Sequence, residues 1–475
     1  MNALHRLRDA YDERRFSTAG LRVLDQLRAH LETPATPVLP WREPLDQVEH
    51  WEQLQRRGPL DLEELAAELI ASSQHVHHPR YLGHQVTAPL PTAALADLIS
   101  SLLNNSGAVY EMSPAHTGIE AVVIRWLSRS LGWTSSSDGF LTNGGTIGNL
   151  TALLAMRQAK SDFDVWQEGS FDGPRFSVLV NEQAHYSIAR AAQVMGWGRD
   201  GAITVATDAS FRMTHAAMQE SLSRAQDKGR TVIGVAANAG STATGSFDQL
   251  HDVADFCESH GLWMHVDGAH GASVCFSEEH RPLIAGIERA DSVVWDAHKM
   301  MMMPALVTAV LFRDEARSFD TFSQAASYLF EGDPREEWHN GAVRTFECTR
   351  QTLGLKLFAA WVVHGEQTFA DYVDVTFDLA RQLAELLQAT DDFELAMHPQ
   401  SNIVCFRHRA PGVDDLDGHQ RALRQAVIRS GEFYLVQTDL PGGTFLRTVL
   451  MNPFTTVADL QALLDLIREL AKDGL

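Results

Sequence analysis

From about residue 92 to residue 312, short runs of apolar and β-branched residues alternate with segments whose apolar residues recur at helical spacing. The strand-like runs lie at residues 139–142, 176–180, 203–206, 232–237, 262–266, 292–295 and 306–312. The helical segments lie at 147–159, 186–195, 215–228 and 249–260. This alternation predicts an α/β fold with a mainly parallel sheet covered by helices. Such sheets bind ligands at the carboxyl ends of their strands, so the residues that follow each strand are the first candidates for a site.

The two ends of the chain have a different pattern. The first 31 residues carry leucines at helical spacing, and we expect this helical pattern to be interrupted near residues 17–20. Four prolines between residues 34 and 44 predict an extended linker, because proline excludes helix. A helix expected at 352–364 leads into the last part of the chain. We therefore predict an N-terminal helical segment (1–91), a large domain (92–365) and a small α+β C-terminal domain (366–475).

Charge and cysteine content argue against several classes of protein. The 39 basic and 61 acidic residues give a net charge of -22, which disfavours binding to nucleic-acid phosphates or to an anionic membrane. Four cysteines have neither the spacing of a metal site nor the density of a disulfide scaffold, and they lie at Cys257, Cys275, Cys348 and Cys405. The N-terminus lacks the apolar stretch of a signal peptide. We expect a cytoplasmic globular protein that binds neither nucleic acid nor membrane.

A glycine pair connects the first predicted strand to the helix that follows it. In Asn143-Gly-Gly-Thr146 the glycines allow the backbone to approach an anion, and the free N–H groups of a helix N-terminus favour negative charge. No Gly-Lys-Ser/Thr follows, so the motif is not a P-loop. The pattern predicts an anion-binding turn, and the alternative is an ordinary connection between strand and helix.

Two later strands end in titratable residues. The segment after residue 264 reads His265-Val-Asp267-Gly-Ala-His270. It could form a metal site with help from His260, hold a cationic ring nitrogen through Asp267 alone, or serve only as capping and core groups. The second strand ends in Asp296-Ala-His298-Lys299. A desolvated lysine can form a Schiff base with an aldehyde, whereas a surface lysine has no such role.

An anion-binding turn, an aspartate and a lysine, in this chain order, match the three groups of pyridoxal phosphate (PLP). The turn would bind the phosphate, Asp267 the ring nitrogen and Lys299 the aldehyde. A zinc enzyme would use Asp267 but leave Lys299 and the glycine pair without a role. The combination therefore favours a PLP enzyme over a metal enzyme.

The chain resembles the group II PLP-dependent amino-acid decarboxylases, which include glutamate, cysteine-sulfinate, diaminobutyrate, aromatic-amino-acid and histidine decarboxylases. The resemblance begins at about residue 77 and rests on eight segments in the same order and at matching spacings: HPRYLGH, YEMSPA, TNGGTIGNLTALL, NEQAHYSIARA, GSTATGSFD, HVDGAHGA, DSVVWDAHKMM and LRTVLMNP. It implies PLP fold type I with a mainly parallel seven-stranded sheet. It also implies an amino-acid decarboxylase that is an obligate homodimer, with active sites at the subunit interface and the N-terminal segment packed on the partner.

The resemblance assigns roles to four residues of the reaction. Lys299 would form the Schiff base with PLP, and Asp267 would bind the pyridine nitrogen. His185 would stack on the ring and help to orient the substrate carboxylate. Tyr328, in a predicted mobile loop, would protonate Cα after carbon dioxide leaves. Further cofactor contacts are implied for Gly145, Thr146, Thr242, Ala269, Asp296 and His298.

The substrate is less constrained than the reaction. Arg447 matches a carboxylate-binding arginine of the glutamate enzyme, and a structural salt bridge is the alternative. Glu111 also occurs in glutamate-type enzymes, and His84 and Gln85 replace the aromatic residues expected for an aromatic substrate. We therefore expect a polar acyclic amino acid, namely 2,4-diaminobutyrate, glutamate, aspartate or cysteine sulfinate. The alternatives are transamination, decarboxylation with oxidative deamination to an aldehyde, a metal hydrolase and a non-catalytic binding protein.

Overall fold

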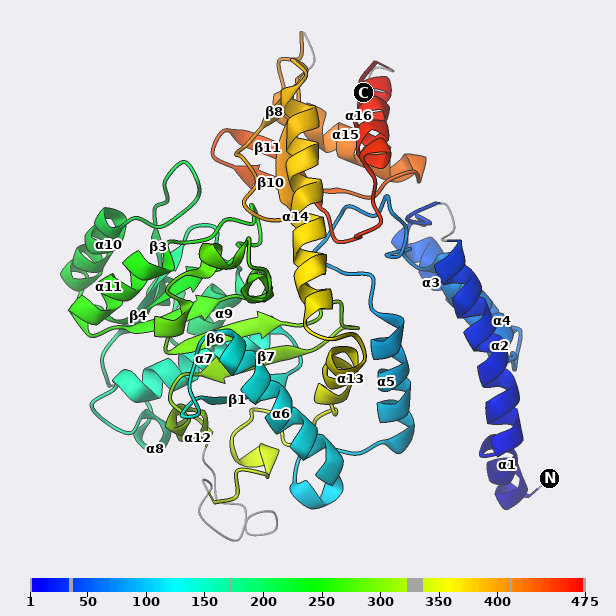
Figure 1. Cartoon of the computed structure of the whole chain (residues 1–475), viewed down its shortest axis with the longest axis horizontal. Coiled ribbons are helices and arrows are strands. Elements are labelled where there is room, and N and C mark those ends of the chain that lie inside the picture. The colour runs from blue at the N-terminus through cyan, green and yellow to red at the C-terminus, as the bar shows by residue number, and fades with distance from the viewer. Residues whose placement is uncertain (1, 34–36, 171, 323–335, 410–411, 473–475) are drawn as a thin grey trace. The chain divides into compact units, whose positions relative to one another are not determined.

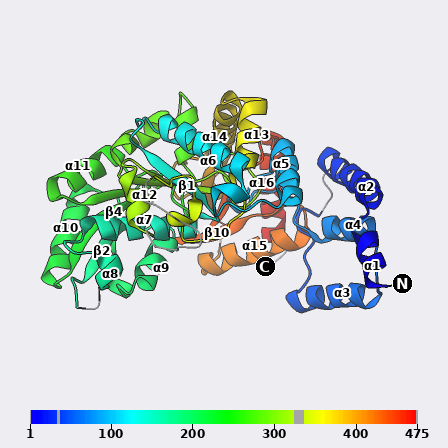
Figure 2. The same ribbon diagram turned by 90° about the horizontal axis from the view of Figure 1, so that it is seen from below.

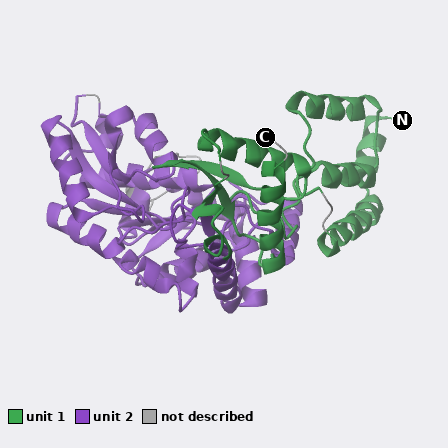
Figure 3. Cartoon of the chain, turned by 90° about the horizontal axis from the view of Figure 1, so that it is seen from above, with its two compact units in different colours: residues 1–84, 386–394, 406–475 green, residues 85–385, 395–405 purple. Residues whose placement is uncertain are grey.

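The computed structural model describes residues 2–33, 37–170, 172–322, 336–409 and 412–472. The chain divides into two compact units (Figure 3). The first unit comprises residues 1–84, 386–394 and 406–475, and the second comprises residues 85–385 and 395–405. The division into three domains at 91/92 and 365/366 stays a prediction. No helix in the described ranges is long and apolar enough to cross a membrane.

The second unit is built on a seven-stranded sheet in the order β1-β7-β6-β5-β4-β2-β3. Its strands are β1 (Asp138–Thr142), β2 (Phe176–Asn181), β3 (Ala202–Val205), β4 (Thr231–Asn238), β5 (Trp263–Asp267), β6 (Ser292–Asp296) and β7 (Thr308–Phe312). The neighbours from β3 to β6 pair in parallel, whereas β7 is antiparallel to both β6 and β1. Each predicted strand overlaps an observed one, and the predicted α/β fold with a mainly parallel sheet is confirmed.

Helices lie on both sides of this sheet (Figures 1 and 2). The helices of the second unit are α5 (Pro91–Leu103), α6 (Pro114–Ser130), α7 (Gly145–Lys160), α8 (Val165–Glu168), α9 (Ser187–Val194), α10 (His215–Asp227), α11 (Leu250–His260), α12 (Ala316–Asp320), α13 (Gly354–His364) and most of α14 (Gln367–Gln388). Helix α7 packs against β6 and β7, and α11 packs against β4 and β5. The sheet is therefore buried on both faces, as its continuous apolar strands require.

Helix α7 lies close to the sheet because its first turns carry small residues. A Cβ atom at Gly148 would lie 3.2 Å from Val294 and 3.3 Å from Thr308, so a larger residue would push the helix outward. One turn further on, Leu153 and Met156 are completely buried in the same apolar core as Val294. This packing fixes the start of α7 beside the carboxyl end of β6.

The first unit combines helices with a four-stranded sheet. Its helices are α1 (Ala3–Ala10), α2 (Glu13–Glu32), α3 (Pro44–Arg56), α4 (Leu62–Ser72), α15 (Leu416–Ser430) and α16 (Val457–Lys472). The sheet has the order β10-β11-β9-β8 and contains β8 (Phe393–Leu395), β9 (Ile403–His408), β10 (Val436–Leu440) and β11 (Gly443–Val449). This small sheet in the C-terminal region agrees with the α+β pattern expected there.

One local expectation was wrong. Helix α2 is continuous from Glu13 to Glu32, so there is no interruption near residues 17–20. The break falls earlier, where the Asp12 carboxylate accepts hydrogen bonds from the backbone N–H groups of Arg14 and Arg15, both at 2.9 Å, and caps α2. The short helix α8 (Val165–Glu168) is capped by Asp164 in the same way.

Candidate active site

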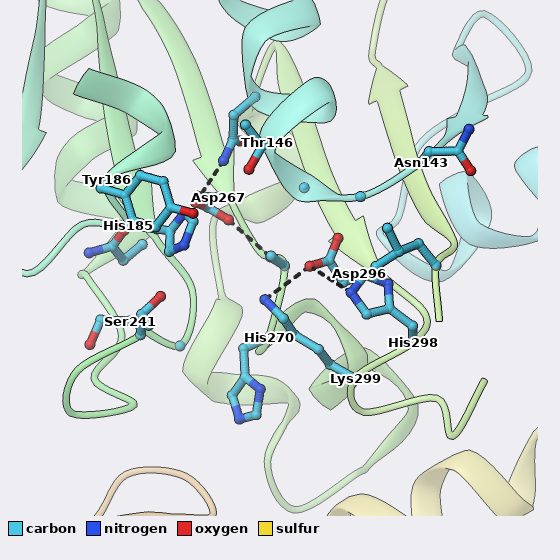
Figure 4. Close-up of a pocket in the computed structure, with 18 residues that line it drawn as sticks. Asn143, Thr146, His185, Tyr186, Ser241, Asp267, His270, Asp296, His298 and Lys299 are labelled. Carbon is cyan, nitrogen blue, oxygen red and sulfur yellow. Dashed lines mark hydrogen bonds and ion pairs between the residues drawn. The ribbon is translucent and has the colours of Figure 1, made fainter. Parts of the chain in front are cut away.

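A cavity of about 290 Å³ lies at the carboxyl ends of β1, β4, β5 and β6 in the second unit. Figure 4 shows Lys299, His185 and Asp267 directed toward it from different elements. The residues that line it are Asn143, Gly144, Gly145, Thr146, Asn149, His185, Tyr186, Asn238, Gly240, Ser241, Thr242, Asp267, Ala269, His270, Asp296, His298, Lys299 and Leu306. All nine predicted cofactor contacts are in this set, so the structure brings together residues that are up to 154 positions apart in the chain (299 minus 145).

The turn between β1 and α7 forms one wall of the cavity. Gly144 has a φ angle of +100°, a backbone conformation that residues with a side chain rarely adopt. A Cβ atom at Gly145 would lie 3.2 Å from both carboxylate oxygens of Asp296. The two glycines therefore let the N-terminus of a 16-residue helix open directly onto the cavity. The free N–H groups and the positive end of the helix dipole favour an anion there.

Asp267 is the last residue of β5, and its carboxylate is held by neutral groups. One oxygen accepts a hydrogen bond from Nδ2 of Asn149 at 2.9 Å, and the other accepts one from the backbone N–H of Ala269 at 3.2 Å. Within the described ranges, no lysine or arginine forms an ion pair with this carboxylate. Its negative charge therefore remains available to a cationic group in the cavity.

Lys299 follows β6 and forms an ion pair with Asp296, the last residue of that strand. The distance from Nζ to Oδ2 is 2.9 Å, and Nε2 of His298 lies 3.6 Å from the same oxygen. Burial alone would raise the pKa of Asp296, but the charges of Lys299 and His298 and a hydrogen bond from Thr308 outweigh it, so the pKa is lowered. Asp296 is therefore an anion that orients the lysine amine inside the cavity.

His185 precedes α9 and places an imidazole in the cavity wall. Its Nδ1 lies 2.8 Å from Oγ of Ser187, and its ring centroid lies 4.2 Å from that of Tyr186. Desolvation lowers the pKa of His185 despite the opposing charges of Asp267 and Asp296. A neutral, flat imidazole is suited to lie against an uncharged or electron-poor ring.

The chemical types in the wall fit PLP. A helix N-terminus can bind a phosphate, a carboxylate can bind a cationic ring nitrogen, and a lysine amine can bind an aldehyde. Asn238, at the end of β4, adds a buried Nδ2 that has no hydrogen-bond partner among the described residues. A donor left in this state costs free energy, so a bound group that accepts a hydrogen bond would relieve it.

The metal site proposed as an alternative is not assembled. Nε2 of His265 lies 2.9 Å from the side-chain oxygen of Asn149, and Nδ1 lies 2.9 Å from Oγ of Ser292. Nε2 of His270 lies 2.7 Å from the side-chain oxygen of Asn402. Within the described residues, no three histidine, cysteine or acidic side chains are arranged to hold a metal ion. The histidines of this motif therefore belong to hydrogen-bond networks.

The predicted substrate contacts are spread over both units. Gln85 and Glu111 belong to the second unit, but neither is in the lining of the cavity as described. His84 and Arg447 belong to the first unit, where partial burial and the positive charges of Arg447 and Arg424 lower the pKa of His84. The roles of these four residues stay predictions. Tyr328 lies outside the described residues, so its role also stays a prediction.

Asn149, Tyr186 and Asn238 are among the cavity residues that were not predicted. Asn149 lies four residues after Gly145, so both are on one face of α7. Asn238 is the last residue of β4, and it is paired with Asp267 on the neighbouring strand β5. Both positions could have been found by asking which polar residues share a helix face or a strand end with the predicted site.

The description "Pyridoxal-dependent decarboxylase conserved domain" belongs to a family model that matches residues 49–409, more than half of the chain. This chain belongs to the pyridoxal-dependent decarboxylase family. Accordingly, the cofactor is PLP and the protein is an amino-acid decarboxylase, a carboxy-lyase. The predictions of family, cofactor and reaction class are confirmed.

Individual relatives agree with this assignment along nearly the whole chain. Human cysteine sulfinic acid decarboxylase is 31% identical over 456 residues, which cover 92% of this chain and 91% of that protein. Human acidic amino acid decarboxylase is 30% identical over 454 residues, covering 92% and 86%. The crystal structure of mouse CSAD in its apo form is 28% identical with a TM-score of 0.89, covering 97% and 99% of the two chains. The decarboxylase fold is therefore the fold of this chain.

Proposed function

We propose that this enzyme decarboxylates an L-amino acid with a short acidic side chain, such as cysteine sulfinate or aspartate, to the corresponding amine. The proposal rests on one observation above all. Lys299, Asp267 and the open N-terminus of α7 meet at one cavity in a chain that is 31% and 30% identical to a cysteine sulfinic acid decarboxylase and an acidic amino acid decarboxylase. Of the polar acyclic substrates expected from the sequence, these two relatives favour the acidic ones.

In this proposal each side chain has a separate task. When bound, PLP supplies an electron-accepting ring that takes up the electron pair left at Cα as carbon dioxide departs. Lys299 holds the cofactor covalently, and Asp296 orients its Nζ. Asp267 meets the positive charge of the ring nitrogen, while the N-terminus of α7 meets the negative charge of the phosphate. His185 packs against the ring and excludes water from it.

The remaining steps involve residues whose roles stay predictions. We propose that Tyr328 donates the proton to Cα, as its resemblance to the family's loop tyrosine implies. We also propose that Arg447 binds a carboxylate of the substrate. Both assignments can be tested by variants. Tyr328→Phe should slow amine formation and leave the cofactor content unchanged. Arg447→Gln should raise KM for acidic substrates more than it lowers kcat.

We further propose that the enzyme is a homodimer with shared active sites. The N-terminal helices support this, because α2 has 20 residues and none of them is buried. Many of the exposed side chains on α1 to α4 are large and apolar: Leu4, Leu7, Phe16, Leu21, Leu24, Leu27, Leu31, Leu45, Val48, Leu62 and Leu69. A surface this apolar is typical of an interface between chains. Sedimentation of the wild type should give twice the mass of the chain, and Leu21→Asp with Leu24→Asp should lower it, unlike the control Arg14→Asp.

A reducing compartment is the proposed location. Cys257, Cys275 and Cys348 are free cysteines, and burial raises the pKa of the Cys257 and Cys275 thiols, which keeps them in the unreactive thiol form. Such unpaired thiols are typical of the cytoplasm. Fractionation of the native cells tests this location directly.

The substrate proposal is tested by incubating the purified, PLP-loaded enzyme with a panel of L-amino acids and measuring carbon dioxide and amine. The panel contains cysteine sulfinate, aspartate, glutamate, 2,4-diaminobutyrate and an aromatic amino acid. Cysteine sulfinate or aspartate should give the highest kcat/KM. Faster turnover of 2,4-diaminobutyrate would overturn the acidic assignment. Aldehyde in place of amine would overturn the simple decarboxylation.

A further inference from the structure

Asn149 is buried, with only 1% of its surface exposed, and its side chain makes three hydrogen bonds inside the site. Nδ2 donates to Oδ2 of Asp267 at 2.9 Å and to Oγ of Ser187, also at 2.9 Å. The side-chain oxygen lies 2.9 Å from Nε2 of His265. One amide thus connects helix α7 with β5 and with the start of α9.

The direction of these bonds follows from chemistry. A carboxylate only accepts hydrogen bonds, so the NH₂ end of Asn149 must face Asp267 and its oxygen must face His265. Nε2 of His265 is then the protonated nitrogen. Burial lowers the pKa of His265 to about 4, so Nδ1 carries no proton at neutral pH and accepts the hydroxyl hydrogen of Ser292. Ser292 in turn accepts a hydrogen bond from Nε1 of Trp263 at 2.9 Å, which leaves only one arrangement of the amide.

The same amide also reaches the imidazole of His185. Because Oγ of Ser187 accepts a hydrogen bond from Asn149, its own hydrogen is free to point at Nδ1 of His185, 2.8 Å away. That contact leaves the proton of the neutral His185 ring on Nε2. Asn149 therefore connects the two side chains that would contact the edge and the face of the PLP ring.

We propose that Asn149 is a positioning residue that fixes the Asp267 carboxylate and, through Ser187, the His185 ring for the cofactor. This inference rests on the proposed roles of Asp267 and His185. Its physical basis is that both NH₂ hydrogens are used at once, so the carboxylate and the imidazole cannot move independently. A buried group with every hydrogen bond satisfied has one orientation, which is what a preorganised site requires.

The experiment uses full-length enzyme loaded with PLP that carries ¹⁵N at the pyridine nitrogen. The ¹⁵N chemical shift reports whether this nitrogen is protonated, and a PLP titration gives the affinity. Asn149→Ala removes both donors. We expect it to shift the ¹⁵N signal toward the unprotonated form and to weaken PLP binding about tenfold to a hundredfold. Ser187→Ala should leave the ¹⁵N signal unchanged and lower only turnover.

A matched control separates positioning from folding. Asn181 is a buried asparagine at the end of β2 in the same unit, and its amide donates to the backbone oxygen of Phe211 at 3.1 Å and to Asp248 at 2.9 Å. Asn181→Ala should lower Tm while keeping the wild-type ¹⁵N signal. The inference is overturned if Asn149→Ala behaves like this control, that is, if it lowers Tm but leaves the PLP affinity and the ¹⁵N signal unchanged. If Asn149→Ala does not fold, Asn149→Ser carries the same test with the same outcomes.

Asp267→Ala in the same assay identifies which idea has failed. A wild-type ¹⁵N signal in Asp267→Ala would overturn the proposed role of Asp267, and with it this inference. A shifted signal in Asp267→Ala together with a wild-type signal in Asn149→Ala would leave the proposed function intact and overturn only the positioning by Asn149.

Discussion

The carboxyl ends of β5 and β6 are neighbours in one sheet, and each ends in a buried aspartate, but the surroundings of these carboxylates differ. Asp267 on β5 is held by an asparagine amide and a backbone N–H, both neutral. Asp296 on β6 is held by Lys299 and His298 and accepts a hydrogen bond from Thr308. The charge of Asp296 is therefore already balanced by the chain, whereas that of Asp267 is not.

The difference shows that strand position alone does not assign a role to a buried carboxylate. An anion in an apolar interior is costly unless it is paired or fully hydrogen-bonded. Asp296 meets this cost with a cation of its own chain. Asp267 meets it in part with dipoles, and a cationic ring nitrogen would complete the balance. The comparison predicts that variants at the two strand ends have effects of different kind and size.

Lys299→Ala should have the largest effect, because it removes the only group proposed to bind the cofactor covalently. Turnover should fall at least about a thousandfold. The yellow absorbance of covalently held PLP should disappear, and circular dichroism should show an intact fold. An undiminished rate would show that the lysine at the β6 end has no catalytic task.

Asp267→Asn should have the next largest effect, since it replaces the charge with a neutral amide of the same shape. A charge-assisted hydrogen bond contributes about 1.5–3 kcal/mol, which corresponds to about a 10- to 150-fold loss in kcat/KM. Steady-state assays with the best substrate measure this loss. A change of less than twofold would mean that the β5 end does not act through its charge.

Asp296→Asn should reduce kcat/KM less, by about tenfold. It disturbs the orientation of Lys299 but keeps the Asp267 carboxylate that would face the cationic ring nitrogen. It should also lower Tm, since the partly buried amine of Lys299 loses its counter-ion. The ratio of this loss to that of Asp267→Asn measures how different the two strand ends are. Equal losses with unchanged Tm would contradict the distinction.

The smallest effect should be a pH dependence of stability that arises from His265 on β5. Burial lowers the pKa of His265 to about 4 in the folded chain, against about 6.5 for an ordinary histidine. Unfolded chains therefore bind a proton that folded chains do not, and stability is fully present above pH 6.5 and declines as the pH falls toward 4. Between pH 6 and pH 5 the free energy of unfolding should drop by about 1 kcal/mol.

His265→Gln provides the control for this pH effect. The glutamine can still offer an N–H to Asn149 but cannot titrate, so its urea-unfolding curves should lose this part of the acid dependence. If wild type and variant show the same slope between pH 6 and pH 5, His265 is not the titrating group.

Sequence reasoning could find the residues that end strands but not the residues that hold them. Lys299 and Asp267 follow short apolar runs, and that local pattern is sufficient to place both at the sheet edge. Asn149 contacts Asp267 across 118 positions of sequence, and this contact depends on how closely α7 packs against the sheet. The expected interruption near residues 17–20 is wrong for a local reason, because the helix accommodates Gly20 and begins instead at the cap formed by Asp12.

The positive φ of Gly144 has a consequence for anyone who wishes to redesign this enzyme for another amino acid. Almost any replacement at this position is unfavourable, because a residue with a side chain is strained in this backbone conformation whatever the space around it. A library that randomises the cavity wall should keep this codon fixed. Its diversity is better spent on wall positions such as Tyr186 and Ser241, where the backbone makes no such demand.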